Sequence, residues 1–259
     1  MLGGLLGDHW LRLPFVIAAA LNAGNLLLAL RALPESRVPN REPFDLAALN
    51  PLQPLRWVLS MKQLLPFIAI FFLLSAAGEV YGTCWALWGR DAFHWNGLWI
   101  GLSLGAFGIC QSLAQALLPG RAVRLFGESG AILAGLAGAG AALAVMAFAT
   151  DGWMVFAVMP VFALGGIGAP ALQSIATRQV DENRQGHFQG VLASTISLAS
   201  VVAPLTFSSF YFSFSSQWPG AIWLTALVPY ALAATMVLGL KLQTANGVQA
   251  GREEEQHTR

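Results

Sequence analysis

The feature that most constrains this chain is a series of long apolar segments separated by short polar breaks. A helix needs about 20 mostly apolar residues to cross about 30 Å of hydrocarbon, because each residue adds about 1.5 Å. Seven segments have that length: Leu13–Leu30, Leu64–Leu87, Leu98–Leu118, Gly130–Ala149, Trp153–Ile175, Phe188–Phe212 and Ala221–Leu240. The sequence therefore predicts an all-α integral membrane protein with seven transmembrane helices.

The composition agrees with a membrane protein and excludes several other classes. Of the 259 residues, 56% are hydrophobic and 10% are charged, whereas soluble domains carry about 25% charged residues. This excludes a soluble enzyme and a disordered protein, and a net charge of +1 leaves no basic face for nucleic acid. Cys84 and Cys110 both lie in apolar runs, so we expect neither a disulfide framework nor a metal site.

The distribution of Lys and Arg predicts the orientation of the chain. With the N-terminus outside, the inner segments are 31–63, 119–129, 176–187 and 241–259, and they hold 12 of the 14 Lys and Arg residues. An excess of positive charge is typical of inner connections. Every Trp except Trp57 maps near an outer helix end, as in an interfacial aromatic belt. We predict an N-terminus outside and a C-terminus inside.

One carboxylate, Glu79, lies inside a predicted span. Counting from Leu64 places it roughly 22 Å along the helix, in the outer third of the membrane. An ionised carboxylate is costly there, so we expect Glu79 to face a wet cavity or to carry a proton. Gly78, Gly82 and Thr83 keep the neighbouring side chains small. The alternative is a structural Glu that reaches the interface or hydrogen-bonds a neighbouring helix.

Several spans also carry side-chain amides. Gln111 and Gln115 are four residues apart and share one helix face, Gln173 follows a glycine-rich stretch, and Asn25 marks one side of the first span. As a set, these residues predict a polar pathway for substrate and protons. Taken singly, each is better explained as a hydrogen bond between helices.

The connection between the third and fourth spans contains a short motif of glycine, arginine and glutamate. Its residues are Gly120, Arg121, Arg124, Gly127 and Glu128. The two Arg side chains can hydrogen-bond the carbonyls at helix C-termini on the inner face. Such a clamp could break and re-form as helices move, which makes the motif a candidate cytoplasmic gate. The alternative is that these charges only set the topology.

The sequence predicts no enzyme, and no cofactor, catalytic residue or metal ligand. Neither His-x-x-x-His nor a phosphate-binding loop occurs. A retinal pigment would need a Lys in the middle of a span. Lys62 and Lys241 both map to inner helix ends, so this class of seven-helix protein is excluded as well.

A series of short motifs follows a fixed order along the chain. They are Asn-Pro-x-x-x-x-Arg-Trp (50–57), Gly-Leu-Ser-Leu-x-x-Phe-Gly-Ile (101–109), Ala-Gln-Ala (114–116), Phe-Gly-Glu (126–128), Gly-Trp-Met (152–154), Gly-Gly-Ile-Gly-x-Pro-Ala-Leu-Gln (165–173), Arg-Gln-Val-Asp (178–181) and Gln-Gly-x-x-Gln-Gly (185–190). Together they resemble the tetracycline-efflux transporters, which are drug:proton antiporters of the major facilitator superfamily. The resemblance runs from Gly3 to about Leu240.

That family has twelve spans in two six-helix halves joined by a long cytoplasmic loop. The resemblance implies that residues 1–33 end the N-terminal half and contain its sixth helix, and that 34–63 form the central loop. It implies that 64–240 form the C-terminal six-helix bundle of a major facilitator fold, while 241–259 are expected to form a disordered cytoplasmic tail. The chain is thus expected to be truncated at its N-terminus.

The resemblance also implies a function. We expect proton-coupled efflux of a drug-like small molecule such as a tetracycline, by a multi-pass protein of the bacterial inner membrane that confers antibiotic resistance. The expected partners are the drug, protons, the lipid bilayer and the missing N-terminal half, without which the chain is expected to be inactive. The alternative is a non-transporting membrane protein that pairs with a separate N-terminal half.

Three positions depart from the family pattern. The family usually has an Asp where this chain has Ala139, and several members have a His where Gln111 stands. Conversely, Glu79 stands where the family more often has Gln. We interpret Glu79 as a relocated acid that supplies the contribution of this half to proton coupling. The residues at 139 and 111 leave the exported compound open.

Overall fold

The computed structural model describes residues 12–32 and 60–257, and from residue 242 onward it describes the backbone alone. These residues belong to two compact units that divide between Asn50 and Pro51. Both consist of helices, and no strand occurs in the described ranges. Seven helical segments are long and apolar enough to cross a membrane, which confirms the predicted fold class.

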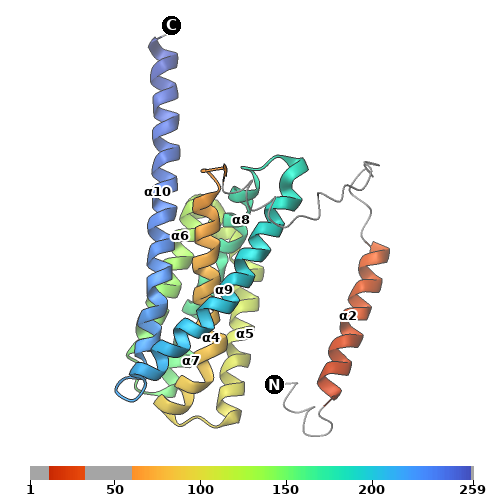
Figure 1. The fold of residues 1–259 in the computed structure, drawn as a ribbon, viewed down its shortest axis with the longest axis vertical. Helices are drawn as coiled ribbons and strands as arrows, with labels where there is room; N and C mark the ends of the chain where they lie inside the picture. The colour runs from red at the N-terminus through yellow and green to blue at the C-terminus, as the bar shows by residue number, and fades with distance from the viewer. Residues whose placement is uncertain (1–11, 33–59, 258–259) are drawn as a thin grey trace. The chain divides into compact units, whose positions relative to one another are not determined.

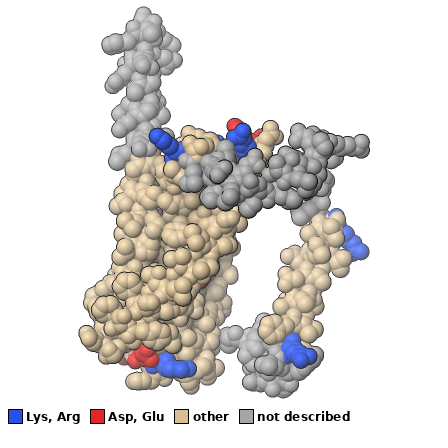
Figure 2. Space-filling model, in the orientation of Figure 1, with Lys and Arg blue, Asp and Glu red and all other residues tan. Residues whose placement is uncertain are grey.

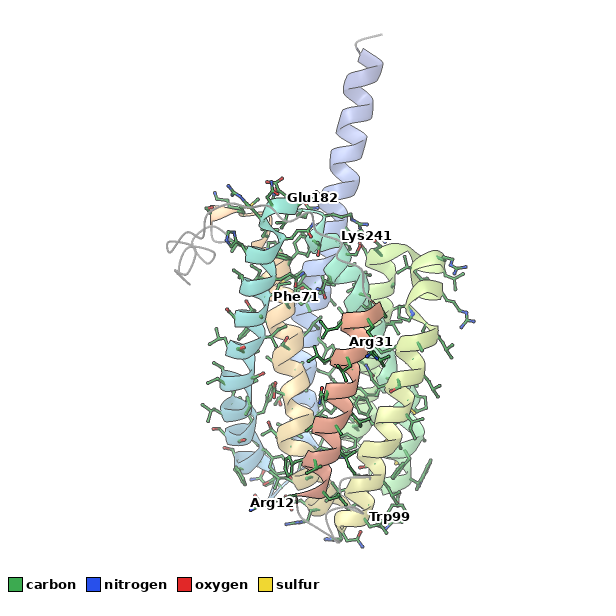
Figure 3. All side chains as sticks on the ribbon, turned by 90° about the vertical axis from the view of Figure 1, so that its right-hand side faces the viewer. Arg12, Arg31, Phe71, Trp99, Glu182 and Lys241 are labelled. Carbon is green, nitrogen blue, oxygen red and sulfur yellow. The ribbon has the colours of Figure 1, made fainter. Side chains whose placement is uncertain are left out.

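The first unit contains one described helix, α2 (Leu13–Ala32), which matches the predicted first span. Figure 3 shows Arg12 and Arg31 at its two ends. Apolar side chains are exposed around the whole helix, including Leu30, which is 73% exposed. A helix with such a surface requires lipid or other helices around it.

The second unit is a bundle of helices that run between two ends (Figure 1). Its elements are α4 (Leu65–Phe93), α5 (Gly97–Leu117), α6 (Pro119–Ala147), α7 (Gly152–Ala163), the 3-10 segment η2 (Leu164–Gly168), α8 (Ala169–Thr177), the 3-10 turn η3 (Glu182–Arg184), α9 (Gln185–Phe214) and α10 (Ala221–His257). Helix α4 packs along α9 and α10, while α6 packs along α7, η2 and α10. The fifth predicted span is thus divided into α7, η2 and α8.

Helix α4 continues past its predicted end at Leu87 and includes residues 89–91, which contain a glycine and an aspartate. The helix ends at His94, which has a left-handed φ of 54° and whose backbone N–H donates to the carbonyl of Arg90 over 3.0 Å. Gly89 remains helical and permits a close contact, since a Cβ there would lie 2.7 Å from the ring of Trp95. This glycine therefore marks tight packing and not a turn.

Two further boundaries differ from the prediction. Helix α6 begins at Pro119, where Pro is tolerated in a first helical turn, so the predicted connection 119–129 is largely helical. It is interrupted at Gly127, whose φ of 70° favours glycine. Helix α10 continues to His257, whereas disorder was predicted from residue 241. Glu, Gln and Arg are good helix formers, and extending an existing helix requires no new nucleus.

Aromatic side chains fill the bundle between the outer parts of its helices. The rings of Trp88 and Trp223 meet edge to face at 4.9 Å, and both are buried. The indole of Trp85 donates a hydrogen bond of 2.9 Å to Ser103. The predicted interfacial belt is therefore wrong for Trp85, Trp88, Trp95 and Trp223, all of which lie in the core.

On the face that Figure 2 shows, the Lys and Arg side chains of the bundle gather at its two ends. In the belt between the ends, Glu79 is the one charged side chain of the described bundle residues. Figure 3 places Glu182 and Lys241 at one end and Trp99 at the other. The end with Lys241 is the predicted inner end. A nearly uncharged belt between charged ends is the pattern that hydrocarbon requires.

Candidate functional site

Glu79 lies at the midpoint of α4, nearer the middle of its helix than predicted, because α4 extends to Phe93. Its Oε1 accepts a hydrogen bond of 2.6 Å from the hydroxyl of Ser200 on α9. The Glu79 side chain is half-buried. A Cβ at Gly78 or Gly82 would meet no atom within 4 Å. The surface beside the carboxylate is therefore open.

Ser200 differs from other hydroxyls of α9 in its partner. Ser194, Ser209 and Ser213 donate to the carbonyl four residues earlier in the same helix, over 2.8–2.9 Å. Such bonds satisfy a hydroxyl locally. Ser200 instead donates to a carboxylate on another helix. A bond of this kind is strengthened when the carboxylate is ionised, and it joins the middle of α4 to the middle of α9.

Gln111 and Gln115 of α5 both lie against the 3-10 segment η2. A Cβ at Gly166 would lie within 3 Å of both amide nitrogens, so a side chain there would displace the two amides from this position. The Gln111 side chain is half-buried and that of Gln115 is exposed. The two amides therefore share one face and one neighbour.

The same segment covers Ala139 of α6. Ala139 is fully buried, and its Cβ lies 2.8 Å from the position that a Cβ on Gly165 would take. A Cβ at Gly135, one helical turn away, would lie 3.0 Å from the Leu164 carbonyl oxygen. An Asp at position 139 would have to displace η2. Where the resembled family has an acid, this chain thus has a packing position.

Gln173 and Asn25 lie apart from these contacts. Gln173 is exposed on α8, and its Nε2 lies 3.4 Å from Oε1 of Gln189 on α9, which is a long hydrogen bond. Asn25 is exposed on α2, which belongs to the first unit.

The predicted gate motif forms two contacts, one on each side of the break at Gly127. Nη1 of Arg121 donates to the carbonyl of Leu117, at the C-terminal end of α5, over 3.1 Å. Glu128 forms an ion pair with Arg178, which directly follows α8. These contacts join the inner ends of α5, α6 and α8.

The remaining members of the motif show no packing constraint. Gly120 and Arg124 are exposed, and a Cβ at Gly120 would meet no atom within 4 Å. A gating role for the motif stays a prediction.

Sequence reasoning overlooked one match to Gly-x-Ser-x-Gly, at residues 101–105. This spacing occurs around nucleophilic serines, where a strand-to-helix turn exposes the hydroxyl. Here Ser103 is fully buried inside α5, donates to the carbonyl of Ile100 over 2.8 Å and accepts from Trp85. Ser103 therefore serves helix packing.

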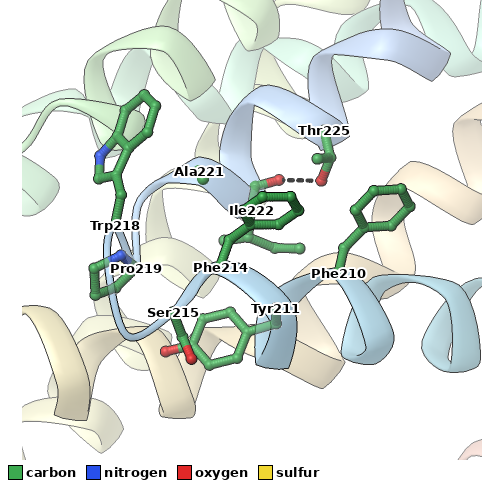
Figure 4. A pocket seen from close by; sticks show the side chains of 9 residues that line it. All are labelled: Phe210, Tyr211, Phe214, Ser215, Trp218, Pro219, Ala221, Ile222 and Thr225. Carbon is green, nitrogen blue, oxygen red and sulfur yellow. Dashed lines mark hydrogen bonds between the residues drawn. The ribbon is translucent and has the colours of Figure 1, made fainter.

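A crevice at one end of the bundle does not qualify as a site, and the described residues offer no metal site. Figure 4 shows a crevice at the turn between α9 and α10, lined by aromatic side chains such as Phe210 and Trp218. Its volume of about 10 Å³ holds about one water molecule. Within residues 12–32 and 60–257, no group of three His, Cys, Asp or Glu side chains is placed to hold a metal ion.

The predicted pathway residues of the bundle thus form three separate contacts and not one cluster. Sequence reasoning did not identify their partners: Ser200, Gly166 and Gln189. Arg178 contributed to the positive charge of the predicted inner segment 176–187, but sequence reasoning did not pair it with Glu128. The mid-helix position of Ser200 could have drawn attention to it, but α9 carries many other hydroxyl groups.

The comparisons with known proteins agree on one family. The sequence model of the Major Facilitator Superfamily matches residues 80–258. The chain is 42% identical to the tetracycline resistance protein, class C, of Escherichia coli, over 88% of this chain and 58% of that protein. It is 36% identical to the class G protein of Vibrio anguillarum, over 89% of this chain and 59% of the relative. With the class B protein of Escherichia coli the values are 30%, 98% and 63%. The chain thus spans about three fifths of the length of these relatives.

Proposed function

Because the chain belongs to the Major Facilitator Superfamily, we propose that it forms part of a proton-coupled exporter of a drug-like small molecule, such as a tetracycline. Its seven apolar helices and its bacterial relatives make it a multi-pass protein of the bacterial inner membrane. The names of the relatives refer to tetracycline resistance. Tetracycline is therefore the first compound to test, although Gln111 and Ala139 depart from the family pattern.

The observation that carries this proposal is the carboxylate of Glu79 in the middle of a membrane-spanning helix. An acid at the centre of a span costs about 3 kcal/mol on insertion scales, and intramembrane acids accordingly face water or exchange protons. The open surface at Gly78 and Gly82 would give water and substrate access to this carboxylate. A purely structural Glu would not need that opening.

The amides of α5 and α8 support a polar pathway within the same bundle as Glu79. Gln115 and Gln173 are exposed in the bundle, and Gln111 is half-buried. Amide groups exposed to hydrocarbon lack hydrogen-bond partners, whereas a water-filled pathway supplies them. We therefore assign these three residues to the pathway for substrate and protons.

Proton coupling would act through the contact between α4 and α9. As a carboxylate, Glu79 accepts the strengthened hydrogen bond from Ser200. When Glu79 takes up a proton, that bond weakens and α4 is held less firmly against α9. A ligand shifts a conformational equilibrium only through contacts that differ between the states. The Glu79–Ser200 bond is such a contact.

The inner ends of α5, α6 and α8 would form the cytoplasmic gate. The Glu128–Arg178 pair is exposed to solvent, since 59% of the Arg178 side chain and 32% of the Glu128 side chain are accessible. Ion pairs of this kind contribute about 0–1 kcal/mol. The hydrogen bond from Arg121 to Leu117 is also exposed. Both contacts can therefore open and close at little cost.

Export would require helices beyond those described. Alternating access occurs by rocking of two structural repeats around a site near the midplane. The described part of this chain supplies one six-helix bundle and α2. We infer that the chain alone does not export and that it acts with a complementary bundle.

The test joins the N-terminal part of the class C relative to this chain and measures proton-driven tetracycline accumulation in inside-out vesicles. We expect accumulation by the chimera and none by the chain alone. Glu79→Gln in the chimera should abolish proton-driven accumulation. Glu182→Gln, which removes an exposed acid near the predicted inner end, should leave it unchanged. Wild-type accumulation by the Glu79→Gln chimera would overturn the role assigned to this carboxylate.

The exposed apolar surface of α2 favours one alternative, a non-transporting membrane protein that pairs with a separate N-terminal half. Co-purification of this chain with separately produced N-terminal helices, without accumulation by the pair or by the chimera, would support that alternative over export.

A further inference from the structure

A cavity of about 890 Å³ opens at the predicted inner end of the bundle. Its walls come from the residues just before α4, the part of α6 after the break at Gly127, the end of α8 and the inner part of α10. None of the pathway residues Glu79, Gln111, Gln115 or Gln173 lines it. The cavity is therefore distinct from the proposed transport pathway.

The charged side chains of this cavity are mainly cationic. Lys62, Arg178 and Lys241 line it, together with one acid, Glu128. Because Glu128 pairs with Arg178, the positive charge in excess belongs to Lys62 and Lys241. These two residues lie just before the first helix of the bundle and at the inner part of the last one, α10. A cavity with this charge repels metal ions and attracts an anion.

The remaining lining includes three polar residues, Gln63, Ser129 and Gln179, and is otherwise apolar, with its buried part formed by four apolar side chains. Phe67 and Ile132 are 5% and 2% exposed, and Leu172 and Val237 are 2% and 3% exposed. Phe67 lies in the first turn of α4, after Lys62, and Val237 precedes Lys241 by about one helical turn. The cavity thus combines cations at the bundle end with an apolar wall toward the core.

We propose that this cavity binds the phosphate headgroup of an anionic phospholipid from the inner leaflet. Basic cavities between transmembrane helices on the cytoplasmic side bind such headgroups. The ammonium groups of Lys62 and Lys241 would contact the phosphate, while the apolar wall at Phe67 and Val237 receives the first part of an acyl chain. A free phosphate ion would use the same cations and would leave that wall uncovered. The proposal holds whether or not the chain takes part in export.

Binding would link the first helix of the bundle to the last. Lys62 and Lys241 lie near the ends of α4 and α10, helices that pack against each other. A lipid that binds only the folded bundle stabilises it by mass action. The binding constant and the unfolding temperature therefore report the same event.

The first experiment compares ligands on the full-length chain, purified in detergent. Phosphatidylglycerol, phosphatidylcholine with the same acyl chains, and inorganic phosphate are titrated separately, while thermal unfolding and native mass spectrometry are recorded. We expect phosphatidylglycerol alone to raise the unfolding temperature and to remain bound. An equal effect of phosphatidylcholine would overturn a charge-selective site. An equal effect of inorganic phosphate would assign the site to the free ion and overturn the lipid proposal.

The second experiment locates the site. Lys62→Gln combined with Lys241→Gln should weaken phosphatidylglycerol binding roughly tenfold or more, since each cation near an anionic lipid contributes measurably. Arg121→Gln is the control for the loss of one charge and is compared with each single variant, Lys62→Gln and Lys241→Gln, because it removes a charge from the same end without lining the cavity. Lys62→Arg with Lys241→Arg should retain binding.

Unchanged binding in the double Gln variant would overturn the proposal, and so would a loss in Arg121→Gln equal to that in each single variant. If the double variant does not purify, the single variants Lys62→Gln and Lys241→Gln replace it, because both side chains are exposed. Each single variant should then bind more weakly than the wild-type chain, and wild-type binding by both would again overturn the proposal.

Discussion

Gly168 gives the sharpest quantitative test of how the 3-10 segment η2 is held against α6. A Cβ at this position would lie 2.6 Å from the Cα of Ile132 and 3.3 Å from its Cβ. Carbon atoms pack at about 3.5–4.0 Å, so η2 and α6 would have to separate by roughly 1 Å. Because the closest atom belongs to the backbone, no side-chain rotation relieves the contact.

The expected cost follows from two opposing terms. Overpacking of a core costs about 1–3 kcal/mol, and a gap of about 1 Å removes up to about half of the dispersion energy of the atoms it separates. The backbone of Gly168 is helical, with φ of −83° and ψ of −14°, so an Ala adds no backbone strain. An Ala in place of a helical Gly contributes about 0.5–1 kcal/mol of stability. We expect Gly168→Ala to lower the free energy of unfolding by about 1–2 kcal/mol.

The assay is unfolding of the purified chain by SDS in mixed micelles, with Gly101→Ala of α5 as the matched control. A Cβ at Gly101 would meet no atom within 4 Å, so this variant should be stabilised by up to about 1 kcal/mol. The two variants should therefore differ by about 1–3 kcal/mol. Equal stability of Gly168→Ala and Gly101→Ala would refute the steric reasoning.

Three further substitutions test single contacts by the same unfolding assay. Tyr211→Phe removes the 2.6 Å hydrogen bond to Asp91 and should cost about 1–2 kcal/mol; an unchanged midpoint would show that the bond is energetically neutral. Reversing Glu128 or Arg178 alone should cost less than about 1 kcal/mol, and the double reversal should restore stability; a coupling energy of zero contradicts the ion pair. Asn96→Ala removes the acceptor at the N-terminus of α5 and should cost about 1 kcal/mol; an unchanged midpoint would contradict a stabilising cap.

The number of spans could be predicted because hydrocarbon thickness fixes the length of an apolar run. The helix ends could not, because tertiary contacts retain turn-type residues inside helices. Gly89 lies against the Trp95 ring, and Asp91 accepts a hydrogen bond from Tyr211 on α9. Both residues resemble turn signals in the sequence. Both are helical in the structure, where the Trp95 ring packs against Gly89 and Tyr211 donates to Asp91.

A Trp near a helix end can lie in an interfacial belt or in a buried aromatic core, and the sequence does not distinguish these two locations. An interfacial belt and an aromatic core near the membrane surface both place Trp at the same register. Trp153 is 69% exposed, whereas Trp223 of α10 is fully buried and meets the ring of Trp88 on α4. The direction in which each indole points depends on helix rotation, which is set by packing.

Only part of the candidate site could be predicted from the sequence. Glu79 could be identified because it is the one carboxylate in an apolar run. Its partner Ser200 lies 121 residues away, on a helix where Ser194, Ser209 and Ser213 bond their own backbone. Glu128 and Arg178 are likewise far apart in the sequence, by 50 residues, so the sequence alone does not pair them. A single sequence predicts which end of the bundle a residue occupies, but not which of the neighbouring helices it faces.

Positions 79 and 139 differ in the space that each leaves for a carboxylate. An acid at position 139 would lie behind η2, in a contact where a Cβ on the facing Gly165 would be only 2.8 Å away. An acid at position 79 lies on an open face, at the centre of α4 and within hydrogen-bond reach of α9. A carboxylate at position 79 instead of position 139 therefore changes which helix contacts depend on its protonation. We propose that in this chain a proton acts on the packing of α4 against α9, while η2 and α6 form a fixed, glycine-packed wall that orients Gln111 and Gln115.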